Sequence, residues 1–153
     1  MLEALQVVST EEARLRIMAA KIIAQARWPY MSTLIFSLRI VESPELPTLA
    51  VDAGWRMYYN PTFVLEQIPE ELATMVLHEA LHCVSKHSTR FESLGREDSS
   101  HVTWNLAGDA NINEILDDAK MPWGEFDPVR YNSLAKYGVQ KGMTTEVTFF
   151  TMV

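Results

Sequence analysis

The segment from Pro69 to Leu94 places the strongest constraint on the fold of this chain. Pro69 suits the first turn of a helix, and Glu70 and Glu71 follow where the helix dipole favours negative charge. Apolar residues then recur at helical spacing, namely Leu72, Met75, Val76, Leu81 and Val84. Gly95 stands where a helix commonly ends. We therefore predict one long helix from Pro69 to Leu94.

Other segments also have helical patterns. A helix capped by Ser9 should run to about Ala26. Its expected apolar stripe is made by Leu15, Met18, Ala19, Ile22, Ile23 and Ala26. A short helix is expected from Thr62 to Gln67 and a longer one from Ser100 to Ala119, whereas the segment that opens at Thr144 is weakly defined.

Three short segments are expected to form strands. Leu34 to Val41 is rich in Ile, Leu, Phe and Val, which favours a buried strand. Thr48 to Asp52 and Trp55 to Tyr59 are separated by Ala53-Gly54, which predicts two strands joined by a tight turn. Helices combined with a small sheet predict an α+β fold, organised as a single domain over residues 1–153 with its motifs between residues 48 and 120.

Composition excludes several classes of function. The 153 residues carry 13 Lys and Arg against 20 Asp and Glu, a net charge of −7, so the chain lacks the basic surface of a nucleic-acid or acidic-membrane binder. The longest apolar stretch is far shorter than the ~20 residues of a membrane-spanning helix. A single cysteine cannot form an intramolecular disulfide, so a cytoplasmic location is expected.

All four histidines lie between His78 and His101, and two of them form the motif H-E-x-x-H at residues 78–82. Residues four apart share one helix face, so His78 and His82 can reach a single ion. Glu79 is displaced by about 100° around the helix, where it can hydrogen-bond a water molecule at the ion. This arrangement is typical of zinc peptidases, in which the glutamate is the general base.

A chance occurrence of the motif is the alternative. With this composition it would arise in roughly one sequence in a hundred, and the histidines would then be ordinary core residues. Burying two imidazoles and a carboxylate without an ion would leave costly unpaired polar groups. A metal site is therefore favoured, with one Zn²⁺ per chain. Cys83, about 140° around the helix from His78, is interpreted as a small core residue and not as a ligand.

A catalytic zinc usually has a third protein ligand. On a continuous helix His87 would be half a turn out of phase with His78, and Glu92 would lie about 15 Å along the axis from His82. If the next helix packs antiparallel through a short turn, Asp109 comes level with His82. Asp109 is the predicted third ligand.

Two other carboxylates on the same predicted helix compete with Asp109 for this role. Glu114 is turned about 140° from Asp109, and Asp117 lies near the end of the helix.

Asp109 belongs to a stripe of polar residues spaced four apart, namely His101, Asn105, Asp109 and Asn113. A solvated helix face would give the same pattern. If Asp109 binds the ion, Asn105 and Asn113 are expected to support its carboxylate by hydrogen bonds. His101 should lie beside Phe91 or Glu92, either at the surface or on the substrate side. An oxyanion-stabilising group is also needed, and spacing does not rank the candidates Tyr131, Tyr137 and His101.

Three segments together carry a resemblance to a known family. They are Val51-Asp52-Ala53-Gly54-Trp55-Arg56-Met57-Tyr58-Tyr59-Asn60-Pro61, Leu77-His78-Glu79-Ala80-Leu81-His82 with His87 and Arg90, and Trp104-Asn105-Leu106-Ala107-Gly108-Asp109-Ala110-Asn111-Ile112-Asn113. This set resembles a bacterial and phage putative metallopeptidase domain, which in larger proteins stands ahead of a von Willebrand A-like domain. Gly108 stands where that family often has Ala.

The resemblance implies a zincin-like α+β fold, with His78 and His82 as zinc ligands, Glu79 as catalytic acid and base, and Asp109 as the third ligand. In such a fold the segment from Thr48 to Asn60 would include an edge strand to which an extended peptide could add. Trp55, Tyr58 and Tyr59 would then face either the substrate or the core.

Two functional hypotheses follow. The first is zinc-dependent hydrolysis of peptide bonds in a peptide or protein substrate. The second is a non-catalytic metal-binding or scaffold protein, for instance a phage assembly component, that uses its apolar C-terminal segment to dock a partner domain or protein. Glu79 favours the first hypothesis, because a purely structural site has no use for a base beside the ion.

Overall fold

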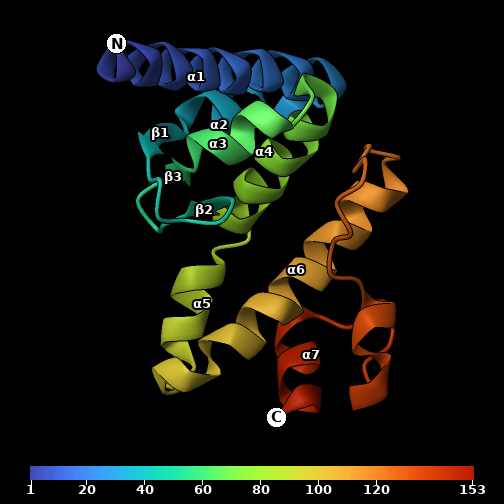
Figure 1. The fold of residues 1–153 in the computed structure, drawn as a ribbon. Coiled ribbons are helices and arrows are strands. Elements are labelled where there is room, and N and C mark those ends of the chain that lie inside the picture. Colours follow the sequence, from blue (N-terminus) through green and yellow to red (C-terminus); the bar gives the residue numbers. More distant parts are fainter. The chain divides into compact units, whose positions relative to one another are not determined.

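The computed structural model describes residue 1 and residues 10–153. Over that part of the chain it contains seven α-helices and a three-stranded mixed sheet, so the α+β prediction is confirmed (Figure 1). Two compact units, Met1–Val84 and Ser85–Val153, divide the chain. Among the described residues, no helix is long and apolar enough to cross a membrane.

The first unit contains five helical segments and the sheet. These are α1 (Leu2–Arg27), the 3-10 helix η1 (Pro29–Met31), α2 (Ser32–Ser37), α3 (Pro61–Glu66) and α4 (Pro69–Val84). The predicted helices ending near Ala26 and around Thr62 to Gln67 are confirmed, whereas the predicted cap Ser9 lies outside the described residues. Asn60 caps α3, because its side-chain oxygen accepts hydrogen bonds from the backbone N–H groups of Thr62 and Phe63.

The face that α1 buries differs from the predicted one. Ala13, Ile17, Ala20 and Ala24 are fully buried, whereas Leu15 and Ile22 of the predicted stripe are 54% and 58% exposed. Small alanine side chains let another helix approach closely, and α1 makes its main contacts with α4. The prediction failed because apolar residues lie on more than one face of α1, so their spacing alone did not determine which face packs against α4.

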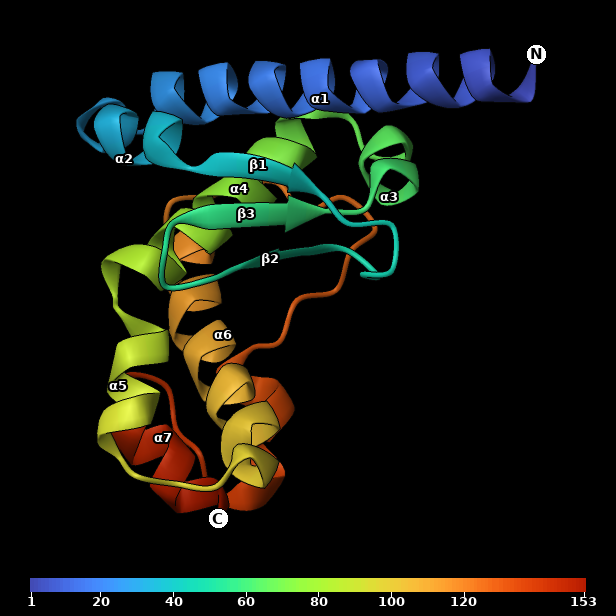
Figure 2. The same cartoon turned by 90° about the vertical axis from the view of Figure 1, so that its left-hand side faces the viewer.

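The sheet contains β1 (Arg39–Glu42), β2 (Leu49–Val51) and β3 (Arg56–Tyr59), in the order β1-β3-β2. The central strand β3 runs parallel to β1 and antiparallel to β2, with Ala50 opposite Tyr58. In Figure 2 the three strands lie below α1 and α4 passes behind them. The predicted hairpin is confirmed, and β2 forms an edge of the sheet.

The predicted buried strand from Leu34 to Val41 is wrong in two respects. Its first half is helical, because Leu34 belongs to α2, and Ile35 and Leu38 are buried at a spacing of three. The strand begins only at Arg39, and three of its four residues are exposed. Short apolar runs of this kind cannot be assigned from periodicity alone.

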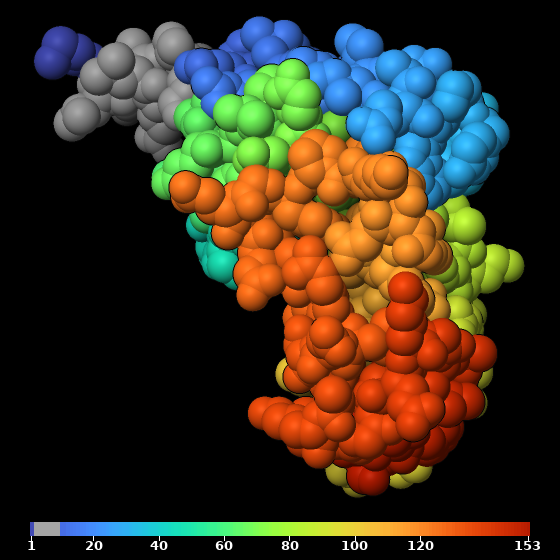
Figure 3. Space-filling model, turned by 90° about the vertical axis from the view of Figure 1, so that its right-hand side faces the viewer, coloured from blue at the N-terminus to red at the C-terminus, as the bar shows by residue number. Residues whose placement is uncertain are grey.

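The second unit is built around α6 (His101–Asp118). It also contains α5 (His87–Ser93), α7 (Thr145–Met152) and the 3-10 helices η2 (Asp98–Ser100) and η3 (Tyr131–Tyr137). Helix α6 confirms the prediction to within one residue at each end. One buried cluster joins Phe91, Trp104, Ala107 and Phe149, and another joins Ala110, Tyr131, Leu134 and Val139. Residues of α7 and η3 gather at one end of the unit (Figure 3).

The predicted continuous helix from Pro69 to Leu94 is wrong, because it breaks between α4 and α5. Lys86 has a left-handed backbone conformation, with φ of 54°, and α5 begins at the next residue. Arg90 donates a hydrogen bond from Nη1 to the Ser85 carbonyl oxygen, which the break leaves without an intrahelical partner. Gly95, with φ of 61°, follows α5 as predicted. Because α4 ends at Val84, helix geometry no longer fixes the positions of His87 and Glu92 relative to the motif. It also no longer predicts that Asp109 lies level with His82.

Lys21 is a charged residue in the core of the first unit. It is 3% exposed, and its Nζ donates a hydrogen bond of 2.6 Å to the Leu38 carbonyl oxygen, just after α2. Burial lowers the pKa of Lys21, since the ammonium form loses its hydration. The hydrogen bond links α1 to the start of the sheet, at an electrostatic cost.

The first prediction concerns the pH dependence of stability. The unfolded chain binds the Lys21 proton more tightly than the folded chain does, so the free energy of unfolding should rise with pH between the lowered pKa and about 10.4, the value of an unfolded lysine. Lys21→Met removes this titration. In urea unfolding from about pH 7 to pH 10, the free energy of the wild type should rise relative to that of the variant. Lys136→Met, at an exposed position, is the control and should run parallel to the wild type.

Candidate metal centre

Helix α4 carries His78 and His82 of the predicted metal site on the face turned away from Leu72, Val76 and Ala80. Leu72, Val76 and Ala80 are fully buried and lie one turn apart from one another. His78 and His82 are offset from Val76 and Ala80 by two residues each, which is about 200° around the helix. Both imidazoles are half-buried. Both histidines therefore lie on a different face of α4 from these three residues, and the first part of that face is buried as well, since Thr74 is fully buried.

The two imidazoles converge on one point. Nε2 of His78 and Nε2 of His82 are 3.0 Å apart, and the rings meet edge to face with their centroids 4.6 Å apart. Nitrogen ligands of one tetrahedral zinc, each at about 2.05 Å, would be separated by about 3.3 Å. A small rotation of either ring accommodates that difference. The observed separation suits a direct N–H···N hydrogen bond between the rings, and it also suits two nitrogen ligands of one metal ion.

Glu79 and Cys83 lie one turn apart on α4. The Glu79 side chain is buried, while Cys83 is half-buried and lies less deep than the predicted core position. Burial raises the pKa of the Cys83 thiol to about 11, and the negative charges of Glu79 and Asp52 add to the shift. The absence of Cys83 from the ligand set stays a prediction.

Asp52 organises the turn between β2 and β3. Its Oδ1 accepts hydrogen bonds from the backbone N–H groups of Gly54 and Arg56, while its Oδ2 accepts from Nε of Arg56 at 2.6 Å and from the Tyr58 hydroxyl at 2.8 Å. Partial burial opposes ionisation of Asp52, but these hydrogen bonds lower its pKa to about 2. Sequence reasoning missed this network, although Asp two residues before Gly is a signal for such a turn.

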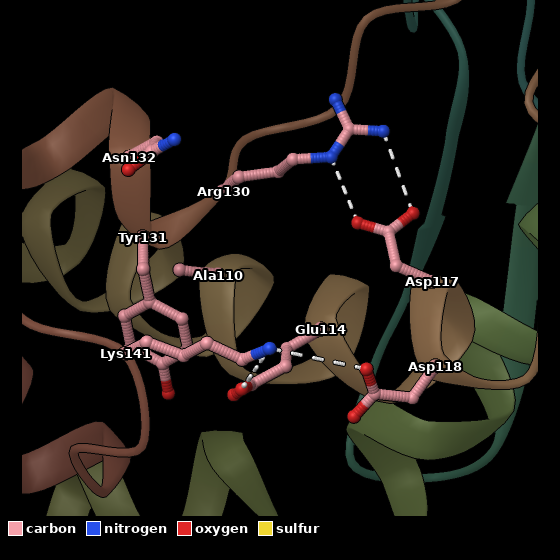
Figure 4. A pocket seen from close by; sticks show the side chains of 8 residues that line it. All are labelled: Ala110, Glu114, Asp117, Asp118, Arg130, Tyr131, Asn132 and Lys141. Carbon is pink, nitrogen blue, oxygen red and sulfur yellow. Dashed lines mark hydrogen bonds and ion pairs between the residues drawn. The ribbon is translucent and has the colours of Figure 1, made fainter.

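Asp109 is half-buried on α6, in the second unit. Its rivals on the same helix are engaged with cations. Asp117 accepts a hydrogen bond from Nε of Arg130 at 2.8 Å, and Arg130 holds the pKa of that carboxyl below its usual value. Glu114 faces the Lys141 ammonium at 3.5 Å. Both pairs border a pocket of about 190 Å³ (Figure 4). The structure therefore gives Glu114 and Asp117 partners in their own unit.

The other residues of the polar stripe lie in different environments. His101 is exposed, and its ring meets that of Phe91 edge to face at 5.1 Å, which confirms the predicted neighbour. Asn105 is exposed and lies 3.2 Å from Nδ1 of His101 through its amide nitrogen. Asn113 is buried and donates a hydrogen bond to the Val129 carbonyl oxygen at 2.8 Å. The proposed support of Asp109 by the two asparagines stays a prediction.

The two candidate tyrosines also differ in their surroundings. Tyr131 is buried, and its hydroxyl donates to the Met143 carbonyl oxygen at 2.6 Å and accepts from the Asn111 amide. Tyr137 is 47% exposed, with the Lys136 ammonium 5.0 Å from its ring centroid. A role in stabilising an oxyanion stays a prediction for both tyrosines and for His101.

Comparison with known proteins identifies the family. A family model described as "putative metallopeptidase domain" matches residues 10–142. The chain belongs to this family. No curated protein and no solved structure matches it. The matched residues include α4, with His78, Glu79 and His82, and the whole of α6, so the family assignment covers every residue of the predicted metal site.

One departure from the family pattern noted in the sequence, Gly108, has a packing explanation. A Cβ atom at this position of α6 would lie 3.0 Å from Nδ1 and 3.1 Å from Cε1 of His87. The His87 ring is buried, and it is held by Thr145 at 3.3 Å and by an edge-to-face contact with Trp104. His87, which the sequence excluded as a ligand, thus closes the core of the second unit against α6.

The second prediction tests this contact. Gly108→Ala should lower the free energy of unfolding, although alanine normally stabilises a helix interior by about 1 kcal/mol relative to glycine, because the His87 ring has little room to move. Combining Gly108→Ala with His87→Ala should restore the alanine benefit. Chemical unfolding of the four proteins in this double-mutant cycle measures the coupling. Additive effects would contradict the proposed clash.

Proposed function

We propose that this chain is a zinc-dependent metallopeptidase that hydrolyses peptide bonds. The observation that carries the proposal is the convergence of the His78 and His82 Nε2 atoms to 3.0 Å beside the buried Glu79, in a member of a metallopeptidase-domain family. Two imidazoles and a carboxylate suit Zn²⁺, which binds nitrogen and oxygen ligands and leaves a position open in catalytic sites. One ion per chain is the proposed stoichiometry.

Asp109 is the proposed third ligand. Together with His78 and His82 it supplies a donor set, two imidazole nitrogens and one carboxylate oxygen, that could hold a metal ion. The rival carboxylates Glu114 and Asp117 already face cations.

Covalent connectivity limits how far Asp109 can lie from the two histidines. Gly108, next to Asp109, packs against the His87 ring. Since His87 follows His82 by only five residues, their Cα atoms can be at most about 17 Å apart in any arrangement of the two units. This limit holds although α4 ends at Val84, so it does not depend on the predicted level of Asp109 opposite His82.

A bound zinc ion would polarise the scissile carbonyl group and lower the pKa of a water molecule at the site. Glu79 would accept the proton of that water molecule as general base and then deliver it to the leaving amine as general acid. The buried position of Glu79 favours this role, because a carboxylate shielded from solvent exchanges its proton with the reactants.

The substrate would be an extended peptide that adds to β2, as a zincin-like fold implies. Thr48 and Asp52 exchange backbone hydrogen bonds with β3, through Asn60 N–H to the Thr48 oxygen and Asp52 N–H to the Arg56 oxygen. By the alternation of an antiparallel pair, Leu49 and Val51 direct their backbone N–H and C=O groups to the opposite side, the free edge of the sheet. Free strand edges of this kind bind peptides by main-chain hydrogen bonds.

A cytoplasmic location remains part of the proposal, supported by the single cysteine of the chain. The alternative, a non-catalytic scaffold that docks a partner through the C-terminal segment, has less support. Nothing in such a protein would require a buried carboxylate next to the two converging histidines.

The third prediction tests catalysis. Glu79→Gln preserves the size of the side chain but cannot accept a proton, so cleavage of an unfolded protein substrate such as reduced casein should fall at least about 100-fold. Zinc content, measured by atomic emission, should stay at the wild-type level. Retained cleavage would defeat the assignment of Glu79. Wild-type protein that neither copurifies with a metal nor can be loaded with zinc would defeat the whole proposal.

The fourth prediction tests the ligand set. Asp109→Ala and His82→Ala should each weaken zinc binding by about 10-fold or more, because loss of a ligand leaves the ion with too few protein donors. Glu114→Ala is the matched control from the same helix and should bind zinc as the wild type does. Competition with a chromogenic chelator gives the affinities. Wild-type affinity in Asp109→Ala would assign the third ligand to another residue.

A further inference from the structure

Trp55 occupies an unusual position in the β2–β3 turn. Its φ angle is 62°, although the preceding residue is Gly54, which could adopt a left-handed conformation without steric cost. A bulky residue with positive φ is an outlier, since its Cβ atom crowds the following carbonyl oxygen. A large aromatic side chain thus occupies the position of the turn at which glycine would have the lowest steric cost.

Several hydrogen bonds hold this strained turn. The Trp55 N–H donates to the Asp52 carbonyl oxygen at 3.2 Å, and the Trp55 carbonyl oxygen accepts from Arg39 N–H at 3.0 Å. The Asp52 side chain accepts from the backbone N–H groups on either side of Trp55, those of Gly54 and Arg56. Strained residues that the surrounding structure holds in this way are concentrated at functional sites.

Within the described part of the chain, the Trp55 side chain forms neither an aromatic pair nor a side-chain hydrogen bond. Among the described residues, no aromatic ring packs against the indole, and no group accepts a hydrogen bond from its Nε1. The side chain is only half-buried. A half-exposed indole with a free N–H is the kind of group that binding surfaces use, because it combines a large apolar area with a polar tip.

The turn lies at the end of the strand edge that the proposed substrate would use. Strand β2, whose free edge is formed by Leu49 and Val51, leads directly into it. Figures 1 and 2 both place the β2–β3 turn beside the C-terminal end of α4, where His82 and Cys83 lie.

We propose that Trp55 is a specificity-determining residue of the peptidase, which binds a bulky apolar or aromatic side chain of the peptide on β2. This inference rests on the proposed function and adds the substrate class to it. Main-chain hydrogen bonds along β2 would be indifferent to sequence, so a side-chain contact is needed for selection. Aromatic stacking and apolar burial on the indole supply that selection.

The test uses two hydroxamate inhibitors with the same peptide backbone, one with a benzyl side chain and one with a methyl side chain, and the zinc-loaded full chain. The wild type should bind the benzyl compound about 10-fold more tightly, and Trp55→Gly should lose this preference. Because glycine accepts a φ of 62°, Trp55→Gly should unfold at the same temperature as the wild type or higher, with the same zinc content. Trp55→Phe should keep most of the preference. Tyr30→Ala removes an aromatic that is 78% exposed elsewhere in the first unit and should keep all of it.

Each outcome decides one question. A benzyl preference that survives in Trp55→Gly, or a wild type that binds both compounds equally, overturns the role of Trp55 and leaves the metallopeptidase proposal standing. A zinc-loaded wild type that binds neither compound overturns both. A preference lost together with zinc content or thermal stability would assign Trp55 to the structure of the turn and would also overturn the inference.

Discussion

The packing of α4 on α1 is the interaction on which the candidate metal centre depends. Alanines at positions 13, 20 and 24, with Ile17, give α1 a flat, fully buried face, and α4 presents its own apolar face in return. Because an α-helix turns by about 100° per residue, burial of one face fixes the direction of every other side chain. The two histidines of the motif are thereby held one turn apart on the face turned away from Val76 and Ala80, where a pair of imidazoles can share an ion.

The end of α4 has a different physical basis. After Val84 the next apolar residue is Phe91, and between them Lys86 adopts a left-handed conformation and a new helix begins. Contacts within the second unit stabilise the break: Trp104 donates from its indole to the His87 carbonyl oxygen at 2.9 Å, and Arg90 binds the Ser85 carbonyl oxygen while pairing with Glu146. A near neighbour thus satisfies the Ser85 carbonyl oxygen, and two partners distant in sequence, Trp104 and Glu146, hold the start of α5. Local sequence patterns could not predict these long-range contacts.

Polar residues that sequence reasoning grouped together turned out to serve different purposes. The stripe at four-residue spacing on α6 contains an exposed His101 and a buried Asn113 that binds the Val129 carbonyl oxygen. Conversely, Asp52, to which the sequence assigned no role, accepts four hydrogen bonds and organises the hairpin beside the motif helix. Spacing along a helix fixes direction, but the chemistry of each position depends on what the tertiary fold places opposite it.

The sequence by itself determined the α+β class, the β2–β3 hairpin, the limits of α6 and the residues of the H-E-x-x-H motif, because caps, turn residues and four-residue spacing are local properties of the chain. Only the tertiary structure decided which face of α1 is buried, where α4 ends, and that Leu34 to Ser37 is helical. Those outcomes depend on close approach between helices and on hydrogen bonds over long sequence separations. The 3.0 Å approach of the two imidazole nitrogens depends on both the sequence and the tertiary structure. The four-residue spacing puts the two rings on one helix face, and the packing of α4 determines the direction in which that face points.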